Sequence, residues 1–339
     1  MNANIPEWKV YFNGNFWGHQ GLERAGTEIP LNRRFVWSGE IWLIPAVYIC
    51  SKGLVMDFCV QIPAERIRSF QDKWSLSAEN AEGVQFTDEQ RMIVEAENPL
   101  IIRANFQAVL NGSILNGAHG CGTIWNPCLP HDHDPESKAV MRHYGLEPAC
   151  GWAIWRAAFP WKTKRKPQIN TLGVTLLQEP AAMPGPHFRV SEIGERFTFT
   201  RPATKEQHTL FVEEYESQEL PRNHFPGQNQ EFPTHFTAMC YTLSPDLGDE
   251  VFSIRDCARS DQPRRRGGKP NGPRARSSAC GIGIIGGARG PVATVAGGGQ
   301  GKLRVACSAL HFEPVKDIEW RMVFREKNRE DVSVELIGS

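Results

Sequence analysis

The sequence lacks a long hydrophobic run, an excess of charge of either sign and a recognisable leader segment. Basic and acidic residues number 38 each in 339 residues, so the formal net charge is zero. This balance disfavours a surface built throughout to attract nucleic acid or an anionic membrane. The most apolar stretch, residues 41–50, is too short for a membrane-spanning helix and contains a proline. No basic segment leads into an apolar one near the N-terminus, so we expect a soluble, cytoplasmic protein without a membrane partner.

A disulfide framework is also absent from the pattern of the nine cysteines. Their number is odd, their spacing is irregular, and several lie in apolar runs such as DFCV and TAMCYTL. Buried reduced thiols that pack as small hydrophobic side chains explain this pattern better than disulfide bonds do.

The sequence lacks the regular alternation of strands and helices that builds a doubly wound sheet. Short runs rich in β-branched and aromatic residues, separated by Gly, Pro and Asn, predict strands instead. We expect a hairpin at Asn13-Gly14 and two strands within residues 91–112, on either side of Asn98-Pro99. Two short helices are predicted, one near residues 63–74 and one that begins after the cap Asp134 and ends at Gly145. The predicted class is mainly β, with antiparallel β-sandwich-like sheets.

The predicted organisation has three parts. Residues 1–125 form an aromatic-rich β region, residues 126–150 a connecting loop with a short helix, and residues 151–339 a second β region. Two sheet systems are expected to meet around residues 126–150. A long Gly/Arg-rich loop at about residues 258–301 interrupts the second region, because a stretch without aromatic residues and rich in glycine cannot build a packed core.

This glycine-rich stretch contains a formal G-x-G-x-x-G at Gly281, Gly283 and Gly286. No strand-like run precedes it, and a proline with further glycines follows, so the strand–turn–helix context of a dinucleotide site is missing. The basic run at residues 264–276 is the part of the chain that nucleic acid phosphates would contact. Because it has no interleaved aromatic residues, we interpret it as a solvated loop.

The segment GIGIIGGARGPV, residues 281–292, resembles the signature IGIIGGADGPT of the membrane β subunit of sodium-pumping biotin-dependent decarboxylases. The resemblance implies a subunit of a sodium-translocating decarboxylase. Arg289 stands where that family has an aspartate, and Val292 stands where it has a threonine. A carboxylate suits sodium because hard cations prefer oxygen ligands.

A loop rich in His, Cys and Asp is the predicted metal site. Zinc binds about four nitrogen or sulfur donors in a tetrahedron, and a single loop can supply them. The alternatives are a metal-dependent, hydrolase-like enzyme and an exposed polar loop without an ion. The predicted ligands are His119, Cys121, Cys128, His131 and His133.

Nine of the ten tryptophans lie at or before residue 161. Exposed aromatic rings on a rigid sheet stack on ligands, whereas buried rings only fill the core. We therefore expect a binding or interaction protein for a carbohydrate or a protein partner, and no enzyme, since no catalytic constellation is evident. The predicted ligand-binding residues are Trp37, Trp42, Trp152, Trp155 and Trp161. The test is whether two or more of these five rings and Trp17 lie exposed on one face.

Overall fold

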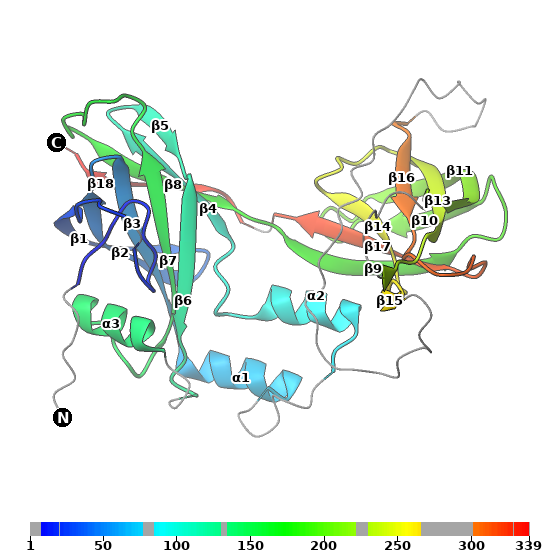
Figure 1. Cartoon of the computed structure of the whole chain (residues 1–339), viewed down its shortest axis with the longest axis horizontal. Coiled ribbons are helices and arrows are strands. Elements are labelled where there is room, and N and C mark those ends of the chain that lie inside the picture. Colours follow the sequence, from blue (N-terminus) through cyan, green and yellow to red (C-terminus); the bar gives the residue numbers. More distant parts are fainter. Residues whose placement is uncertain are drawn as a thin grey trace. The chain divides into compact units, whose positions relative to one another are not determined.

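A computed structural model describes residues 8–19, 21–76, 85–129, 134–221, 230–265, 301–327 and 329–338. The structure is mainly β, with 48% strand and 11% helix, as the sequence predicts (Figure 1). The chain divides into two compact units: unit 1 comprises Met1–Ala181 with Lys327–Ser339, and unit 2 comprises Ala182–Glu326. No helix among the described residues is long and apolar enough to cross a membrane.

Unit 1 contains two antiparallel sheets that pack face to face. Phe58 of one sheet and Phe106 of the other stack in the shared core with ring centroids 3.9 Å apart. This arrangement is a β-sandwich. The first sheet has the order β1 (Thr27–Trp37), β2 (Glu40–Ile49), β3 (Gly53–Ile62), β7 (Gly151–Pro160), β6 (His119–Trp125). The second has the order β18 (Val332–Ile337), β8 (Leu172–Gln178), β4 (Ala104–Leu110), β5 (Ser113–Asn116).

The central strands of the first sheet are buried on both faces. Alternate residues of a strand point to opposite faces, so one set of β3 side chains fills the sandwich core and the other set points outward. The helix α3 (Pro135–Tyr144) covers part of that outer face, where its Val140 and Met141 pack with Trp152. Residues 8–26 cover another part with Val10 and Phe12. Two-sided burial explains why β2 and β3 are almost continuously apolar in sequence.

Two helices match their predicted positions. The helix α1 (Ala64–Trp74) places Ile67 in the sandwich core. The side chain of Asp134 accepts a hydrogen bond from the backbone N–H of Ser137 at 2.6 Å, and Gly145 ends α3 with a φ of 60°. Both ends of α3 are therefore set by local signals, a carboxylate cap and a glycine in the left-handed region.

The helix α2 (Asp88–Glu97) lies where the sequence suggested a strand, and that prediction is wrong. Thr87 and Gln90 form a reciprocal capping box, in which each side chain accepts a hydrogen bond from the other residue's backbone N–H. Asp88 and Glu89 in the first turn favour the helix further through its dipole. These local signals outweigh the β-branched pair Ile93-Val94.

The predicted hairpin at Asn13-Gly14 is also wrong, although its turn exists. The N–H of Gly14 donates to the carbonyl of Tyr11 at 3.2 Å, but residues 8–26 contain no described strand. The apolar side chains on either side of this turn pack onto the outer face of the first sheet instead of pairing with each other.

Unit 2 is a second pair of antiparallel sheets. Its core includes Trp320, Phe252 and Phe324, which come from one sheet, and Met239 and Tyr241 from the other. The sheets have the orders β10 (Arg196–Thr200), β11 (Gln207–Glu219), β13 (His235–Ser244), β16 (Arg304–Cys307), and β14 (Phe252–Asp256), β17 (Glu319–Glu326), β9 (Ala181–Arg189). A two-stranded sheet pairs β12 (Gln230–Glu231) with β15 (Arg264–Arg265).

The boundary between the units differs from the one predicted at residues 126–150. That segment lies inside unit 1, because β6 and β7 on either side of it pair with each other. Unit 2 is inserted between β8 and β18, which are themselves paired neighbours. Of the glycine-rich insertion, residues 266–300 lie outside the described residues, and with them the resemblance at 281–292.

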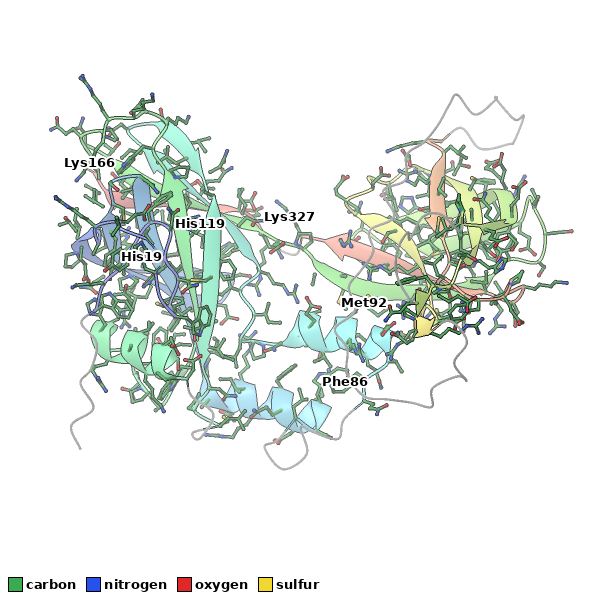
Figure 2. The ribbon with its side chains drawn as sticks, viewed as in Figure 1. His19, Phe86, Met92, His119, Lys166 and Lys327 are labelled. Carbon is green, nitrogen blue, oxygen red and sulfur yellow. The ribbon has the colours of Figure 1, made fainter. Side chains whose placement is uncertain are left out.

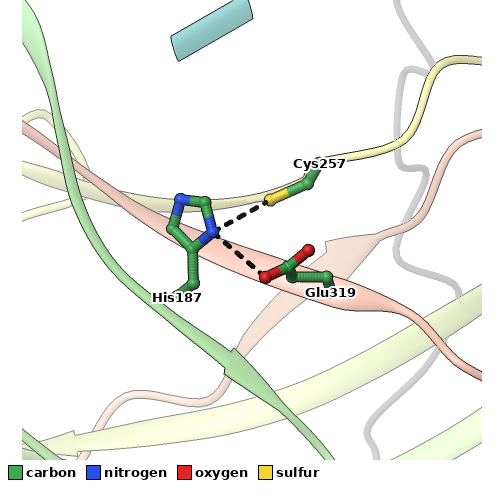
Figure 3. Close-up of side chains that lie close together, drawn as sticks. All are labelled: His187, Cys257 and Glu319. Atoms are coloured by element: carbon green, nitrogen blue, oxygen red, sulfur yellow. Dashed lines mark hydrogen bonds and ion pairs between the residues drawn. The ribbon is translucent and has the colours of Figure 1, made fainter.

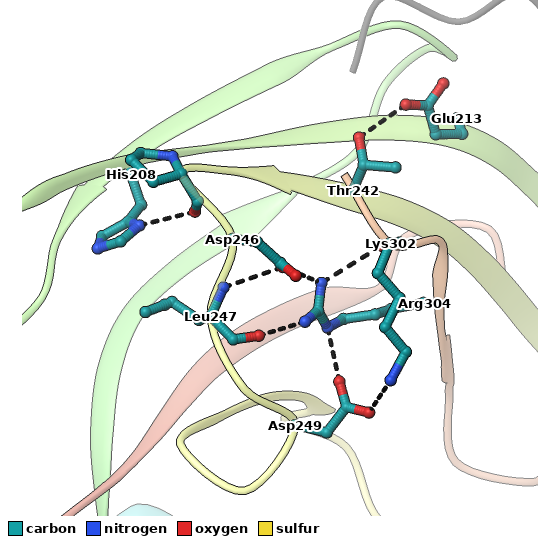
Figure 4. A network of polar contacts seen from close by, with 9 residues as sticks. His208, Glu213, Thr242, Asp246, Leu247, Asp249, Lys302 and Arg304 are labelled. Atoms are coloured by element: carbon teal, nitrogen blue, oxygen red, sulfur yellow. Dashed lines mark hydrogen bonds and ion pairs between the residues drawn. The ribbon is translucent and has the colours of Figure 1, made fainter. Parts of the chain in front are cut away.

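A buried arginine of β16 holds the loop that follows β13 in unit 2 (Figure 4). Arg304 donates hydrogen bonds to Asp246 at 2.6 Å, to Asp249 at 2.8 Å and to the carbonyl of Leu247. The Arg304 hydrogen bond lowers the pKa of Asp246, and Lys302 together with Arg304 lowers the pKa of Asp249. The loop after β13 is therefore attached to β16 by charged hydrogen bonds.

We expect this network to make unit 2 sensitive to acid. A carboxyl group whose pKa is lower in the folded state stabilises that state above its unfolded pKa, and this contribution is lost as the pH falls through the folded pKa. Asp249→Asn should lower the free energy of unfolding by up to about 1 kcal/mol at pH 7 and by much less near pH 3. The effect is small because the Asp249 side chain is exposed and solvent screens its charge. Urea unfolding of both proteins at the two pH values measures this. Glu192→Gln, at an exposed site of unit 2, is the control; an equal effect of Asp249→Asn at both pH values would contradict the prediction.

The insertion of unit 2 between paired strands predicts that unit 1 folds without it. Gln178 donates its backbone N–H to Asp331 at 2.8 Å and accepts from the N–H of Arg329 at 2.6 Å, so the two ends of the gap are held together within unit 1. Replacing residues 182–326 with a short Gly/Ser linker should leave a cooperative thermal transition and native near-ultraviolet circular dichroism. Phe58→Ala in the same shortened chain should lower its stability by about 3–5 kcal/mol. A shortened chain without a cooperative transition would show that unit 1 depends on unit 2.

Candidate functional site

A buried ion pair lies on the outer face of the first sheet of unit 1. Asp57 of β3 and Arg156 of β7 are direct cross-strand neighbours, 0% and 4% exposed. The guanidinium donates from Nε to Oδ1 and from Nη2 to Oδ2, both at 2.7 Å. This two-point geometry is the strongest form of a charged hydrogen bond between side chains.

A chain of hydrogen bonds connects this ion pair to α3 and to the N-terminal segment. Tyr144 donates its hydroxyl proton to Oδ2 of Asp57 at 2.7 Å. Since that proton is committed, the 2.7 Å contact between the two tyrosine oxygens requires Tyr48 to donate to Tyr144. The indole N–H of Trp8 then donates to Tyr48 at 2.8 Å. One carboxylate thus orients side chains from three parts of unit 1.

The charge states in this cluster follow from burial. Burial raises the pKa of both Tyr48 and Tyr144, so both hydroxyls remain neutral donors near pH 7. Burial alone would lower the pKa of Arg156, but the charge and hydrogen bonds of Asp57 more than offset this and raise it overall. Arg156 is therefore a permanent cation.

Aromatic rings cover the guanidinium on the side away from the sheet. The Arg156 carbon Cζ lies 4.3 Å from the ring centroid of Phe16 and 5.2 Å from that of Trp8. Trp8 also stacks on His143 with centroids 4.5 Å apart. These contacts are cation–π and stacking interactions, and they fix the orientation of both rings.

A cavity of about 360 Å³ opens above this cluster, with Arg156 in its wall. Trp8, Phe16 and Trp17 line it with ring surfaces, and Asn15 and Glu136 add polar groups. Trp17 is 55% exposed and meets Phe16 edge to face, with ring centroids 6.3 Å apart. The combination of aromatic walls with a few polar groups is typical of small-molecule sites.

Hydrogen bonds within the N-terminal segment hold the exposed rings in place. The backbone N–H of Trp17 donates to the Asn15 side chain at 2.9 Å. Asn13 donates its side-chain amide to Glu23 at 2.7 Å, and Glu23 also pairs with Lys52. Figure 2 labels His19, which stacks on Tyr11 at 4.0 Å and completes the rim.

The five tryptophans predicted to bind a ligand do not form an exposed platform. Trp37, Trp42 and Trp152 are 6%, 3% and 2% exposed and belong to the cores of unit 1. Trp155 and Trp161 are half-buried against the sandwich core. Trp37 and Trp42 line a smaller cavity of about 190 Å³, where the indole N–H of Trp42 has no partner among the described residues.

The predicted metal loop is only partly described, since His131 and His133 lie outside the described residues. The ring nitrogen Nε2 of His119 lies 2.6 Å from the carbonyl oxygen of Phe12, and Figure 2 labels this histidine on β6. The thiol of Cys128 instead points to the carbonyl of Ala64 and packs against the sandwich core. Among the described residues, the ligand atoms of His119, Cys121 and Cys128 do not all lie within 4.8 Å of one another. A zinc site in this loop stays a prediction.

The glycines of HGCG have a packing role. A Cβ atom built on Gly120 would lie 2.7 Å from Nε1 of Trp155, and one on Gly122 would lie 2.9 Å from the same ring. Trp155 is the cross-strand neighbour of Gly122, so its ring lies over the two glycines. The two glycines that flank Cys121 therefore accommodate an indole ring.

Apart from Trp17, no residue that lines the larger cavity is predicted from the sequence to belong to a site. The signal for them is the density of aromatic residues in WKVYFNGNFWG, a pattern that also fits a hairpin. No protein-family model, curated protein or solved structure matches this chain. The function is therefore argued from the chemistry of the site.

We expect the buried ion pair to be essential for the stability of unit 1. Arg156→Met leaves an uncompensated buried carboxylate and should lower the free energy of unfolding by about 3–5 kcal/mol. The double variant Asp57→Leu/Arg156→Met removes both charges and should be more stable than Arg156→Met alone. Urea unfolding at pH 7 measures both.

Arg91→Met is the matched control, because Arg91 and Asp88 form an exposed pair 3.9 Å apart on α2. It should cost less than about 1 kcal/mol. A loss of similar size in Arg156→Met and Arg91→Met would contradict the assignment of a dominant buried pair.

Proposed function

We propose that this chain is a binding protein that recognises a carbohydrate in the aromatic-lined cavity of unit 1. The observation that carries the proposal is the exposed indole of Trp17 beside Phe16, above the fixed cation of Arg156. A sugar ring presents an apolar C–H face that stacks on an aromatic ring and hydroxyl groups that hydrogen-bond to polar neighbours. Rigid aromatic side chains supply the first contact at low entropic cost.

The polar groups of the cavity support the same ligand class. Asn15 offers both a donor and an acceptor, Glu136 accepts, and Arg156 donates. Asp57 largely neutralises Arg156, and the opposite charges of Lys9 and Glu136 balance each other in the lining. The cavity therefore does not demand an anion, and a neutral sugar with several hydroxyl groups fits it. A purely apolar ligand would leave these polar groups without partners.

The site favours binding over hydrolysis. Glycoside hydrolysis uses two carboxyl groups roughly 5–9.5 Å apart on either side of the scissile bond. Glu136 is the carboxylate among the residues that line the cavity. The nearby Asp57 already accepts from Arg156 and Tyr144 and is fully buried, so it does not offer a second acid or base.

The proposal predicts a tryptophan-dependent affinity for glycans. A glycan array selects the ligand, and calorimetry then measures the dissociation constant. Trp17→Ala should weaken binding by about tenfold or more, which corresponds to a stacking contribution of about 1.4 kcal/mol. Because Trp17 is exposed, the free energy of unfolding of the variant should stay within about 0.5 kcal/mol of that of the parent chain.

Trp74→Ala is the matched control, since Trp74 is a half-exposed indole on α1 outside the cavity, bonded to Glu97. It should leave glycan affinity unchanged. Equal affinity in Trp17→Ala and the parent chain would place the ligand elsewhere. Selection of peptides in place of glycans by the same cavity would replace the carbohydrate with a protein partner.

A further inference from the structure

Three side chains of unit 2 that are far apart in sequence meet on the face of the three-stranded sheet away from the core (Figure 3). His187 lies on β9, Glu319 on the central strand β17, and Cys257 directly follows β14. The imidazole Nδ1 is 3.3 Å from Oε1 of Glu319 and 3.9 Å from the thiol of Cys257. One ligand atom from each residue lies within 4.8 Å of the other two.

We propose that His187, Cys257 and Glu319 form a zinc-binding site. Zinc bonds to nitrogen and oxygen at about 2.0–2.2 Å and to sulfur at about 2.3 Å, so ligand atoms in a tetrahedral site are about 3.3–3.6 Å apart. The contact between His187 and Glu319 already has this length. The contact between His187 and Cys257 exceeds it by a few tenths of an ångström, which a small side-chain rotation removes.

The sheet register places the ligands without help from a long loop. Asp256 pairs with Trp320, and the N–H of Cys257 donates to the carbonyl of Glu319 at 2.9 Å, so Cys257 and Glu319 are cross-strand neighbours. Asp256 accepts backbone N–H groups from Ala258 and Ala309, both at 2.8 Å, and this anchors the chain around Cys257. The adjacent Trp320 is 0% exposed in the core.

A neighbouring ion pair orients the carboxylate. Nη2 of Arg189 lies 3.6 Å from Oε2 of Glu319, while Nη1 of the same side chain donates to Asp317 at 2.6 Å. Arg189 thus engages one oxygen of Glu319 and leaves the other directed at His187. An outer partner that fixes a ligand in this way is a regular feature of metal sites. Arg189 is therefore a positioning residue.

The chemistry of the three donors selects among metals. A thiolate and an imidazole favour zinc and related transition metals, whereas calcium and magnesium prefer oxygen ligands. The charges of a thiolate and a carboxylate balance a divalent ion, and binding releases the thiol proton to solvent. Because His187 is exposed and the other two are half-buried, the fourth tetrahedral position faces solvent.

A catalytic Cys-His-Glu triad is less compatible with this geometry. In such a triad one ring nitrogen of the histidine faces the nucleophile and the other faces the acid. Here the same nitrogen, Nδ1, faces both Cys257 and Glu319. A single metal ion satisfies all three groups at once.

Cobalt substitution tests the site in the full chain, prepared without a histidine tag and stripped with a chelator. We expect one equivalent of Co²⁺ to give a thiolate-to-cobalt absorption band and the intense visible bands of a four-coordinate ion. Stoichiometric Zn²⁺ should remove both. Cys257→Ser should abolish the thiolate band, and His187→Ala and Glu319→Gln should each weaken Zn²⁺ binding by tenfold or more. Arg189→Met should weaken it by about tenfold while keeping the band, as expected for a positioning residue.

Cys307→Ser is the matched control, because Cys307 is an exposed thiol on β16 in the other sheet of unit 2. It should retain the band and the affinity. Thermal melting of each variant without metal separates loss of the site from loss of the fold, and Glu319→Gln is nearly isosteric.

The proposal is overturned if the parent chain gives no thiolate band, or if the band survives in Cys257→Ser. Loss of the band in Cys128→Ser instead would move the metal to the loop at residues 119–133. None of these results depends on the cavity of unit 1.

Discussion

The Asp57–Arg156 ion pair is the interaction on which the organisation of unit 1 depends. Two opposite charges on adjacent central strands are withdrawn from water, and such a burial is tolerated only when every donor and acceptor finds a partner. The sheet supplies the pair, α3 supplies Tyr144, and the N-terminal segment supplies the rings of Trp8 and Phe16. The outer layer of unit 1 is therefore assembled around a charge and not only around apolar surface.

The arginine of this pair also lies in the wall of the cavity. The rings of Trp8 and Phe16 stack on its guanidinium and, together with Trp17, line the space above it. The hydrogen bonds of Asn15 and Glu23 stiffen the N-terminal segment, whose described residues contain no strand or helix. The structural ion pair and the proposed binding surface thus share one arginine, which links the stability of unit 1 to its proposed role.

Unit 2 carries a different kind of site. Its three proposed zinc ligands rely on the regular spacing of an antiparallel sheet, where side chains on one face of neighbouring strands lie close together. Arg304 serves the other end of the unit by joining β16 to the loop after β13. Unit 2 is inserted in the sequence between the paired strands β8 and β18 of unit 1. Each unit has its own hydrophobic core, so the two proposed sites belong to separately packed units.

Local signals in the sequence determined the strand-rich class and the limits of α3, because a capping aspartate and a terminal glycine act over a few residues. The capping box of α2 is also a local signal. The apolar, β-branched run that follows it favours a strand, which is why the sequence alone predicts the wrong element there. Burial was not determined locally. Trp37 and Trp17 both lie in aromatic stretches of the sequence, yet Trp37 is buried and Trp17 is exposed. The difference depends on which parts of the chain pack over each residue. Asp57 and Arg156 are 99 residues apart, and the triad spans residues 187 to 319. Only the tertiary structure decided these pairings, because strand register brings distant residues into contact and no short-range pattern encodes it.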